Sequence, residues 1–199
     1  QFQFQLFGNL WTNVMAAKVR VFLAMSLDGY IAGPNNELDW LHPGDGAEDT
    51  FTPFFTSIGA MLMGKTTHNI VAAMDHPWPY GDVPVLVATR SKLDSPGAST
   101  VRVVSGPITE IVDQAKAVAA EIGKDVYLDG GALVRSGLDA GCVDELIITV
   151  IPIVLGAGVP LFAGVERRHN LHLVSTRALG AGLVELKYSL KTEEAPQKA

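Results

Sequence analysis

Apolar runs separated by Gly, Pro, Asp and Asn divide the chain into short segments along most of its length. Continuous apolar or β-branched runs predict buried strands, and apolar positions spaced by three and four predict helices with one buried face. The expected strands are residues 18–25, 60–63, 83–88, 101–104, 126–129, 144–152, 171–176 and 183–190. The expected helices are residues 51–58, 64–74, 107–122 and 132–140, and loops are expected at residues 31–46 and 155–162.

Strands and helices alternate through most of this pattern, which predicts an α/β fold with a mostly parallel central sheet covered on both faces. The last two strands are joined by the glycine-rich segment 178–182, so we expect them to close the sheet as an antiparallel hairpin. We expect one domain over residues 18–190, an extension or arm at residues 1–17 and a tail at residues 191–199.

The first fourteen residues, QFQFQLFGNLWTNV, alternate Gln with Phe or Leu, and Met15 is a plausible original start. A period of two is typical of a strand with one apolar face. Two interpretations stay open. The segment is either an upstream extension without function or an arm that packs on another subunit.

Composition narrows the class of function. The chain has 199 residues and a net charge of -6, so it offers no basic field for a nucleic acid. The single cysteine, Cys142, excludes an internal disulfide and predicts a cytoplasmic protein. No apolar run approaches the roughly 18 residues that a membrane span needs. The five histidines are scattered without metal-ligand spacing, so no metal site is expected.

Two glycines, Gly130 and Gly131, stand where a buried strand meets a helix. Without Cβ atoms they let the backbone approach a ligand, and the free N–H groups of Ala132 and Leu133 would bind a pyrophosphate. A tight turn or close helix–sheet packing explains the glycines equally well.

Two further junctions carry groups that suit a phosphate. Residues 64–67 place a glycine, Lys65 and two threonines at a helix start, although simple helix capping beside a solvated lysine would need the same residues. Thr89, Arg90 and Ser91 follow the next strand. Three such junctions at one edge of a sheet favour a dinucleotide with a 2′-phosphate.

The motifs SLDGYIAGPNNELDW, MLMGKTTHNI, HPWPYGD, VLVATRSK, VYLDGGALVRSGLDAG and VDELIITVIPIVLGAGVPLF occur in an order that resembles the dihydrofolate reductase-like superfamily. Within it, the chain is most similar to the reductase domain of the bifunctional riboflavin-biosynthesis deaminase-reductase and its stand-alone relatives. The likeness covers roughly residues 18–190. It implies a three-layer fold, NADPH as cofactor, hydride transfer to a small pterin- or aminouracil-like heterocycle, and a homodimer.

The resemblance also implies site residues. Those expected to bind the cofactor are Ala24, Ile31, Ala32, Gly64, Lys65, Thr66, Thr67, Thr89, Arg90, Ser91, Gly130, Gly131, Ala132 and Leu133. Those expected on the substrate side are Trp40, Phe51 and Trp78.

A reductase of this kind needs a proton donor beside the reduced bond. Glu48 stands near the position of the family's catalytic carboxylate, but it also fits an acidic helix cap. Asp28 matches the family's SLDG segment, but it also fits an ordinary turn. Thr149 matches a threonine that lies beside the catalytic carboxylate in the family. The alternative function is a non-catalytic nucleotide-binding or regulatory protein that retains the fold.

Overall fold

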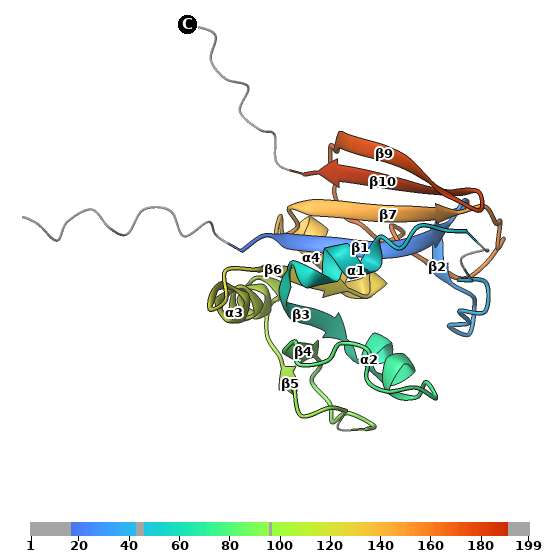
Figure 1. The fold of residues 1–199 in the computed structure, drawn as a ribbon. Helices are drawn as coiled ribbons and strands as arrows, with labels where there is room; N and C mark the ends of the chain where they lie inside the picture. Colours follow the sequence, from blue (N-terminus) through green and yellow to red (C-terminus); the bar gives the residue numbers. More distant parts are fainter. Residues whose placement is uncertain (1–16, 43–45, 96, 191–199) are drawn as a thin grey trace, which may run out of the picture.

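A computed structural model describes residues 17–42, 46–95 and 97–190, and it shows one large sheet between two layers of helices (Figure 1). The expected tail at residues 191–199 lies outside the described residues, and so does the expected arm at residues 1–17 except for Ala17, which is buried in the apolar core. The strands are β1 (Val19–Ser26), β2 (Tyr30–Ala32), β3 (Ile58–Gly64), β4 (Val85–Ala88), β5 (Val101–Val104), β6 (Asp125–Asp129), β7 (Glu145–Ile151), β8 (Val159–Pro160), β9 (His172–Gly180) and β10 (Leu183–Ser189). The helices are α1 (Phe51–Thr56), α2 (Lys65–Ala72), α3 (Ile108–Ala120) and α4 (Gly131–Asp139).

The large sheet has the strand order β5-β4-β3-β6-β1-β7-β10-β9. All neighbours from β5 to β7 run parallel, and β10 runs antiparallel to both β7 and β9. The predicted α/β class, the mostly parallel sheet and the closing hairpin are therefore confirmed.

The apolar core explains the three layers. On one face of the sheet, α3 and α4 bury Val112 and Leu138 against strand residues such as Leu128. On the other face, α1 buries Phe54 against Tyr127, and α2 contributes Val71. Each burial of a large apolar side chain stabilises the fold by about 1.5–3 kcal/mol, so the two clusters fix both helix layers on the sheet.

Several element boundaries differ from the prediction. The helix expected at residues 51–58 ends at Thr56, and Ile58 is instead the first residue of β3. At Gly59 a Cβ would lie 3.0 Å from the backbone of Ala119, so the glycine allows the start of β3 to pack closely against α3.

The expected loops at residues 31–46 and 155–162 contribute to a second sheet, the short antiparallel pair β2–β8. Strands this short give no periodic signal in the sequence. The hairpin strand β9 also runs on to Gly180, because Ala181 and Gly182 both have positive φ (49° and 78°) and form the tight two-residue turn that favours hairpins.

Candidate functional site

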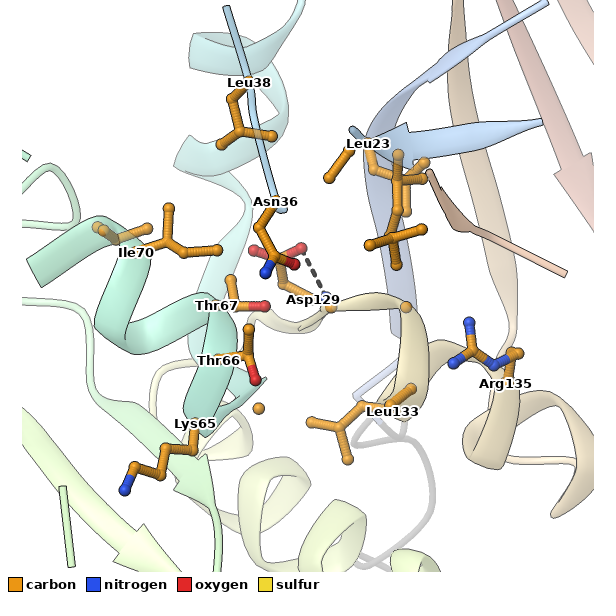
Figure 2. Close-up of a pocket in the computed structure, with 18 of the residues that line it drawn as sticks. Leu23, Asn36, Leu38, Lys65, Thr66, Thr67, Ile70, Asp129, Leu133 and Arg135 are labelled. Atoms are coloured by element: carbon orange, nitrogen blue, oxygen red, sulfur yellow. Dashed lines mark hydrogen bonds between the residues drawn. The ribbon is translucent and has the colours of Figure 1, made fainter. Parts of the chain in front are cut away.

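The main cavity, of about 580 Å³, lies at the carboxyl ends of β1, β3, β4 and β6 (Figure 2). Ligands of open α/β sheets bind at this edge. The residues that line it are Leu23, Ala24, Ile31, Ala32, Asn36, Leu38, Leu41, Gly64, Lys65, Thr66, Thr67, Ile70, Val71, Ala88, Asp129, Gly130, Gly131, Ala132, Leu133, Arg135 and Val159. Most of the predicted cofactor residues are therefore brought together in one place.

Two helix N-termini open onto this cavity. Because β3 and β6 are neighbours, with Met63 opposite Asp129, the helices that follow them begin side by side. The first N–H groups of a helix have no partner within it, and the helix dipole adds a partial positive charge there. The pair of N-termini, with the hydroxyl groups of Thr66 and Thr67, forms a cradle for an anion such as a pyrophosphate.

Gly130 allows the two helix starts to meet. It adopts φ 95° and ψ 129°, a conformation essentially restricted to glycine, and a Cβ there would lie 2.7 Å from Oγ1 of Thr67. At Gly131 a Cβ would lie 2.8 Å from Cδ1 of Ile31. Both glycines thus permit close packing where the starts of α2 and α4 meet Ile31, and pyrophosphate binding at the pair stays a prediction.

Asp129 is the carboxylate of the cavity. It is the last residue of β6, and Figure 2 shows its carboxyl group in the middle of the cavity, where Oδ1 accepts a hydrogen bond of 2.7 Å from the N–H of Gly130. Burial raises the pKa of Asp129 from 3.8 to about 6, although that hydrogen bond lowers it. The side chain is thus able to exchange a proton near neutral pH.

Two buried tyrosines, Tyr80 and Tyr127, interact electrostatically with Asp129. Tyr127 lies two residues earlier on the same face of β6, and its hydroxyl donates a 2.7 Å hydrogen bond to the carbonyl of Phe22. Burial, and then the negative charge of Asp129, raise the pKa values of Tyr80 and Tyr127, so both phenols stay neutral. The two phenols therefore supply no positive charge to balance that of Asp129.

A second cavity, of about 510 Å³, adjoins the first through the shared residues Ala88 and Leu133. Its lining residues are Ala88, Thr89, Arg90, Ser105, Gly106, Ile108, Ile111, Leu133 and Ser136. The predicted Thr89 and Arg90 therefore lie in this extension of the main cavity. Ser91 stands beside it, where its N–H donates to Oγ1 of Thr89 at 3.1 Å.

Lys65 lines the main cavity, but its ammonium group turns away from the threonines of the cradle (Figure 2). Nζ lies 2.9 Å from Oδ1 of Asp94 and donates to the carbonyl of Lys92 at 2.8 Å and to Oγ of Ser91 at 3.4 Å. These contacts of Lys65 connect the loop after β4 to the start of α2.

The three predicted catalytic residues lie outside the lining of both cavities. Asp28 accepts hydrogen bonds from the Ser26 hydroxyl and from the N–H groups of Leu155 and Gly156. These hydrogen bonds lower the pKa of Asp28 and hold the loop before β8 in place. Glu48 is 56% exposed and pairs with Arg177 at 3.2 Å. Thr149 is buried on β7, next to the cavity residue Ala24 of β1.

The predicted substrate-side aromatics also lie behind the lining. Trp40 packs in a small cluster around Ile151, and its Nε1 donates to the carbonyl of Glu37 at 3.2 Å. Phe51 stacks on Phe55 in the aromatic cluster under α1. Trp78 packs edge-on against Tyr80. None of these three rings lines either cavity, so their role on the substrate side stays a prediction.

The cavity residues that the sequence prediction missed include Asp129, Asn36, Arg135 and, in the second cavity, Ser105 and Gly106. A signal existed for two of these positions. Asp129 ends a buried strand immediately before the glycine pair, and Ser105 begins the turn after another strand. Strand ends gather at one edge of a parallel sheet, so polar residues there are site candidates.

In the described part of the chain, no group of His, Cys, Asp and Glu side chains could hold a metal ion. Over the same residues, none of the helices is long and apolar enough to cross a membrane.

Comparison with known sequences identifies the family. The family model described as the RibD C-terminal domain matches residues 17–185. The Bacillus subtilis (strain 168) protein YwjB is 33% identical over 180 residues, which cover 87% of this chain and 98% of YwjB. The protein YyaP of the same organism is 31% identical over 194 residues, covering 88% and 96%.

Solved structures agree with this assignment. A putative riboflavin biosynthesis protein from Shewanella sp. PV-4 has a TM-score of 0.78 and 32% identity, with 87% of this chain and 99% of that chain covered. Dihydrofolate reductase from Enterococcus faecalis, complexed with NADP(H), has a TM-score of 0.60 and 19% identity, covering 87% and 96%, which shows the shared fold. The chain therefore belongs to the RibD C-terminal domain family, a family of reductase type with the dihydrofolate reductase-like fold.

Proposed function

We propose that the chain is a cytoplasmic, NADPH-dependent reductase of a small heterocyclic substrate. The observation that carries the proposal is one cavity in which two helix N-termini face a carboxyl group with a pKa near 6. The N-termini suit the pyrophosphate of a dinucleotide, and the carboxyl group suits proton transfer.

The residues of the site fit this cofactor. Backbone N–H groups after Gly64 and Gly130 would hold the pyrophosphate, and the adjoining cavity with Arg90 would hold the adenosine end. The apolar side chains of Leu23, Ala24 and Ile31 would exclude water from the nicotinamide end. When bound, the cofactor supplies a hydride. The likeness in fold to a dihydrofolate reductase complexed with NADP(H) supports NADPH as this cofactor.

Asp129 would supply or relay the proton that accompanies hydride transfer. A carboxyl group that is partly protonated near neutral pH can also pair with a ring nitrogen and an exocyclic amine, which pterins and aminouracils present. Lys65 and Arg135 are the cations among the residues that line the main cavity. Both are engaged, since Lys65 donates to the carbonyl of Lys92 and Arg135 to that of Pro160, each at 2.8 Å. The site therefore suits an uncharged heterocycle better than a sugar phosphate.

Saturating NADPH is expected to raise the melting temperature of the protein, because a ligand that binds only the native state stabilises it by mass action. At a hundred times the dissociation constant, the stabilisation is about 2.7 kcal/mol. Differential scanning fluorimetry with NADPH, NADH and free adenine measures it. The absence of a shift at millimolar NADPH would contradict the cofactor proposal.

A specific observation favours a second candidate, a non-catalytic nucleotide-binding or regulatory protein. Asp28, Glu48 and Thr149 lie outside the lining of both cavities, which leaves Asp129 as the one carboxyl group among the described lining residues. Turnover separates the two candidates. Oxidation of NADPH with dihydropterins or aminouracils supports the reductase, whereas tight binding without oxidation across that panel supports the alternative.

The proposed homodimer would form through one face of the β9–β10 hairpin. This face carries Leu173, Val184, Leu186 and Tyr188. These residues share one face of β9 and β10, and their cross-strand neighbours there, Thr176 and Ala178, are also uncharged. The opposite face holds Arg177, Glu185 and Lys187. Leu173 is 57% exposed, and the hairpin stands clear of the helices (Figure 1). An uncharged apolar face meets its own copy about a two-fold axis without repulsion.

Leu173→Glu is expected to convert the proposed homodimer to a monomer, because each interface would then bury two carboxylates without partners. Ser175→Glu, on the opposite face of the same strand, is the matched control and should remain dimeric. Analytical ultracentrifugation measures both masses. A wild-type monomer, or a Leu173→Glu dimer of unchanged affinity, would exclude this surface.

A further inference from the structure

Asp94 holds the ammonium group of Lys65 at the edge of the proposed cofactor site. The Nζ–Oδ1 distance is 2.9 Å, and the other carboxylate oxygen, Oδ2, accepts a hydrogen bond of 2.5 Å from the side-chain amide of Asn69. Asn69 lies one helical turn after Lys65 on α2. The carboxylate therefore bridges two side chains of the same helix, and its position relative to Lys65 is fixed from both sides.

The contacts of Lys65 use its whole capacity to donate. An ammonium group has three N–H donors, and three acceptors surround this one: Asp94, the carbonyl of Lys92 and the hydroxyl of Ser91. Any phosphate that binds Lys65 must replace at least one of them. Lys92 and Ser91 contribute neutral acceptors, so Asp94 is the contact whose charge opposes an incoming anion.

Arg90 differs from Lys65 in this respect. It is exposed, and within the described residues its side chain has neither an ion pair nor a hydrogen bond. Of the two cations that the adenosine end offers, one is thus available to an anion and the other is already neutralised. A carboxylate that neutralises one of these cations opposes the binding of a 2′-phosphate more than that of an uncharged 2′-hydroxyl.

We propose that Asp94 is a specificity-determining residue that lowers the preference of this site for the 2′-phosphorylated dinucleotide by occupying Lys65. The inference rests on the proposed function, because it requires the adenosine end of a dinucleotide to lie beside residues 65 and 90. Removal of the charge frees the ammonium group for a phosphate, while Asn at position 94 keeps the shape of the side chain. NADH, which lacks the phosphate, gains nothing from the change.

Isothermal titration of wild type and Asp94→Asn with NADPH and with NADH tests the proposal. We expect Asp94→Asn to lower the dissociation constant of NADPH about three- to tenfold and to leave that of NADH within about twofold. The effect is modest because Asp94 is 71% exposed and water and salt screen its charge. The gain should shrink as the salt concentration rises.

Two controls assign the effect to Lys65. In the background of Lys65→Ala, the substitution Asp94→Asn should give no gain, since the freed donor is absent. Asp82→Asn removes an equal charge from the exposed loop before β4 and should leave the ratio of the two dissociation constants unchanged. An unchanged or reversed ratio in Asp94→Asn overturns the role of Asp94 alone. Failure of the wild type to bind either dinucleotide overturns the cofactor proposal and this role with it.

Discussion

Asp129→Asn is expected to lower the turnover number at least a hundredfold with the first substrate identified. The amide keeps the size of the side chain and can still accept the hydrogen bond from Gly130, but it has no proton to give. In the wild type, the protonated fraction of a group with a pKa of about 6 falls about tenfold per pH unit above that value. The rate should fall in the same way above pH 6, and the Asn variant should lose this limb. Steady-state oxidation of NADPH from pH 5 to pH 9 measures both.

Stability provides the control for Asp129→Asn. A folded-state pKa raised above its ordinary value means that the fold disfavours the ionised carboxylate, so Asp129 lowers stability as pH rises from about 4 to about 6, and the full penalty persists above that range. The Asn variant lacks the penalty. It should therefore be more stable than wild type by about 1–3 kcal/mol at pH 8 and by about half as much at pH 5. If the Asn variant loses turnover and gains stability, it has kept its fold and lost only the proton-transfer step. If its rate still falls above pH 6 as in the wild type, Asp129 is excluded as the proton donor.

Features that depend on the local pattern of apolar residues and glycines could be predicted from the sequence alone. Apolar runs located the strands of the parallel sheet, and glycines at residues 64 and 130–131 located the junctions that border the main cavity. A parallel sheet brings its strand ends to one side regardless of the loops, so the positions of the junction residues followed from the order of strands and helices alone.

Features that depend on contacts between residues far apart in the sequence could not be predicted from it. Asp28 binds the N–H groups of residues 155 and 156, and Lys65 binds Asp94 across the loop after β4. Neither partner is marked by spacing or periodicity. The raised pKa of Asp129 likewise follows from burial in the assembled cavity, and residue type cannot reveal burial. The chemistry of the site was therefore less predictable than its location.

Gly130→Ala is expected to weaken both the fold and the binding of NADPH. The methyl group would meet Oγ1 of Thr67 at 2.7 Å, and alanine rarely adopts φ 95° with ψ 129°. We expect the free energy of unfolding to fall by about 2–4 kcal/mol, combining about 1–3 kcal/mol of backbone strain with the steric conflict. The dissociation constant of NADPH should rise at least tenfold, because the methyl group and the displaced helix start both obstruct the anion cradle. Urea unfolding and calorimetric titration measure the two effects.

Two further variants separate strain from obstruction. Gly123→Ala substitutes another glycine of positive φ (65°) where a Cβ would meet nothing within 4 Å. It should cost about 1–2 kcal/mol of stability and leave the affinity for NADPH unchanged. In Gly130→Ala combined with Thr67→Ala, the conflict with the hydroxyl is removed, so part of the lost stability should return. Affinity should stay low, because the cradle has lost a hydroxyl donor and still contains the methyl group. Full recovery of affinity in the double variant would mean that Gly130 serves only the packing of α2 against α4, and that the backbone at this junction does not hold the pyrophosphate.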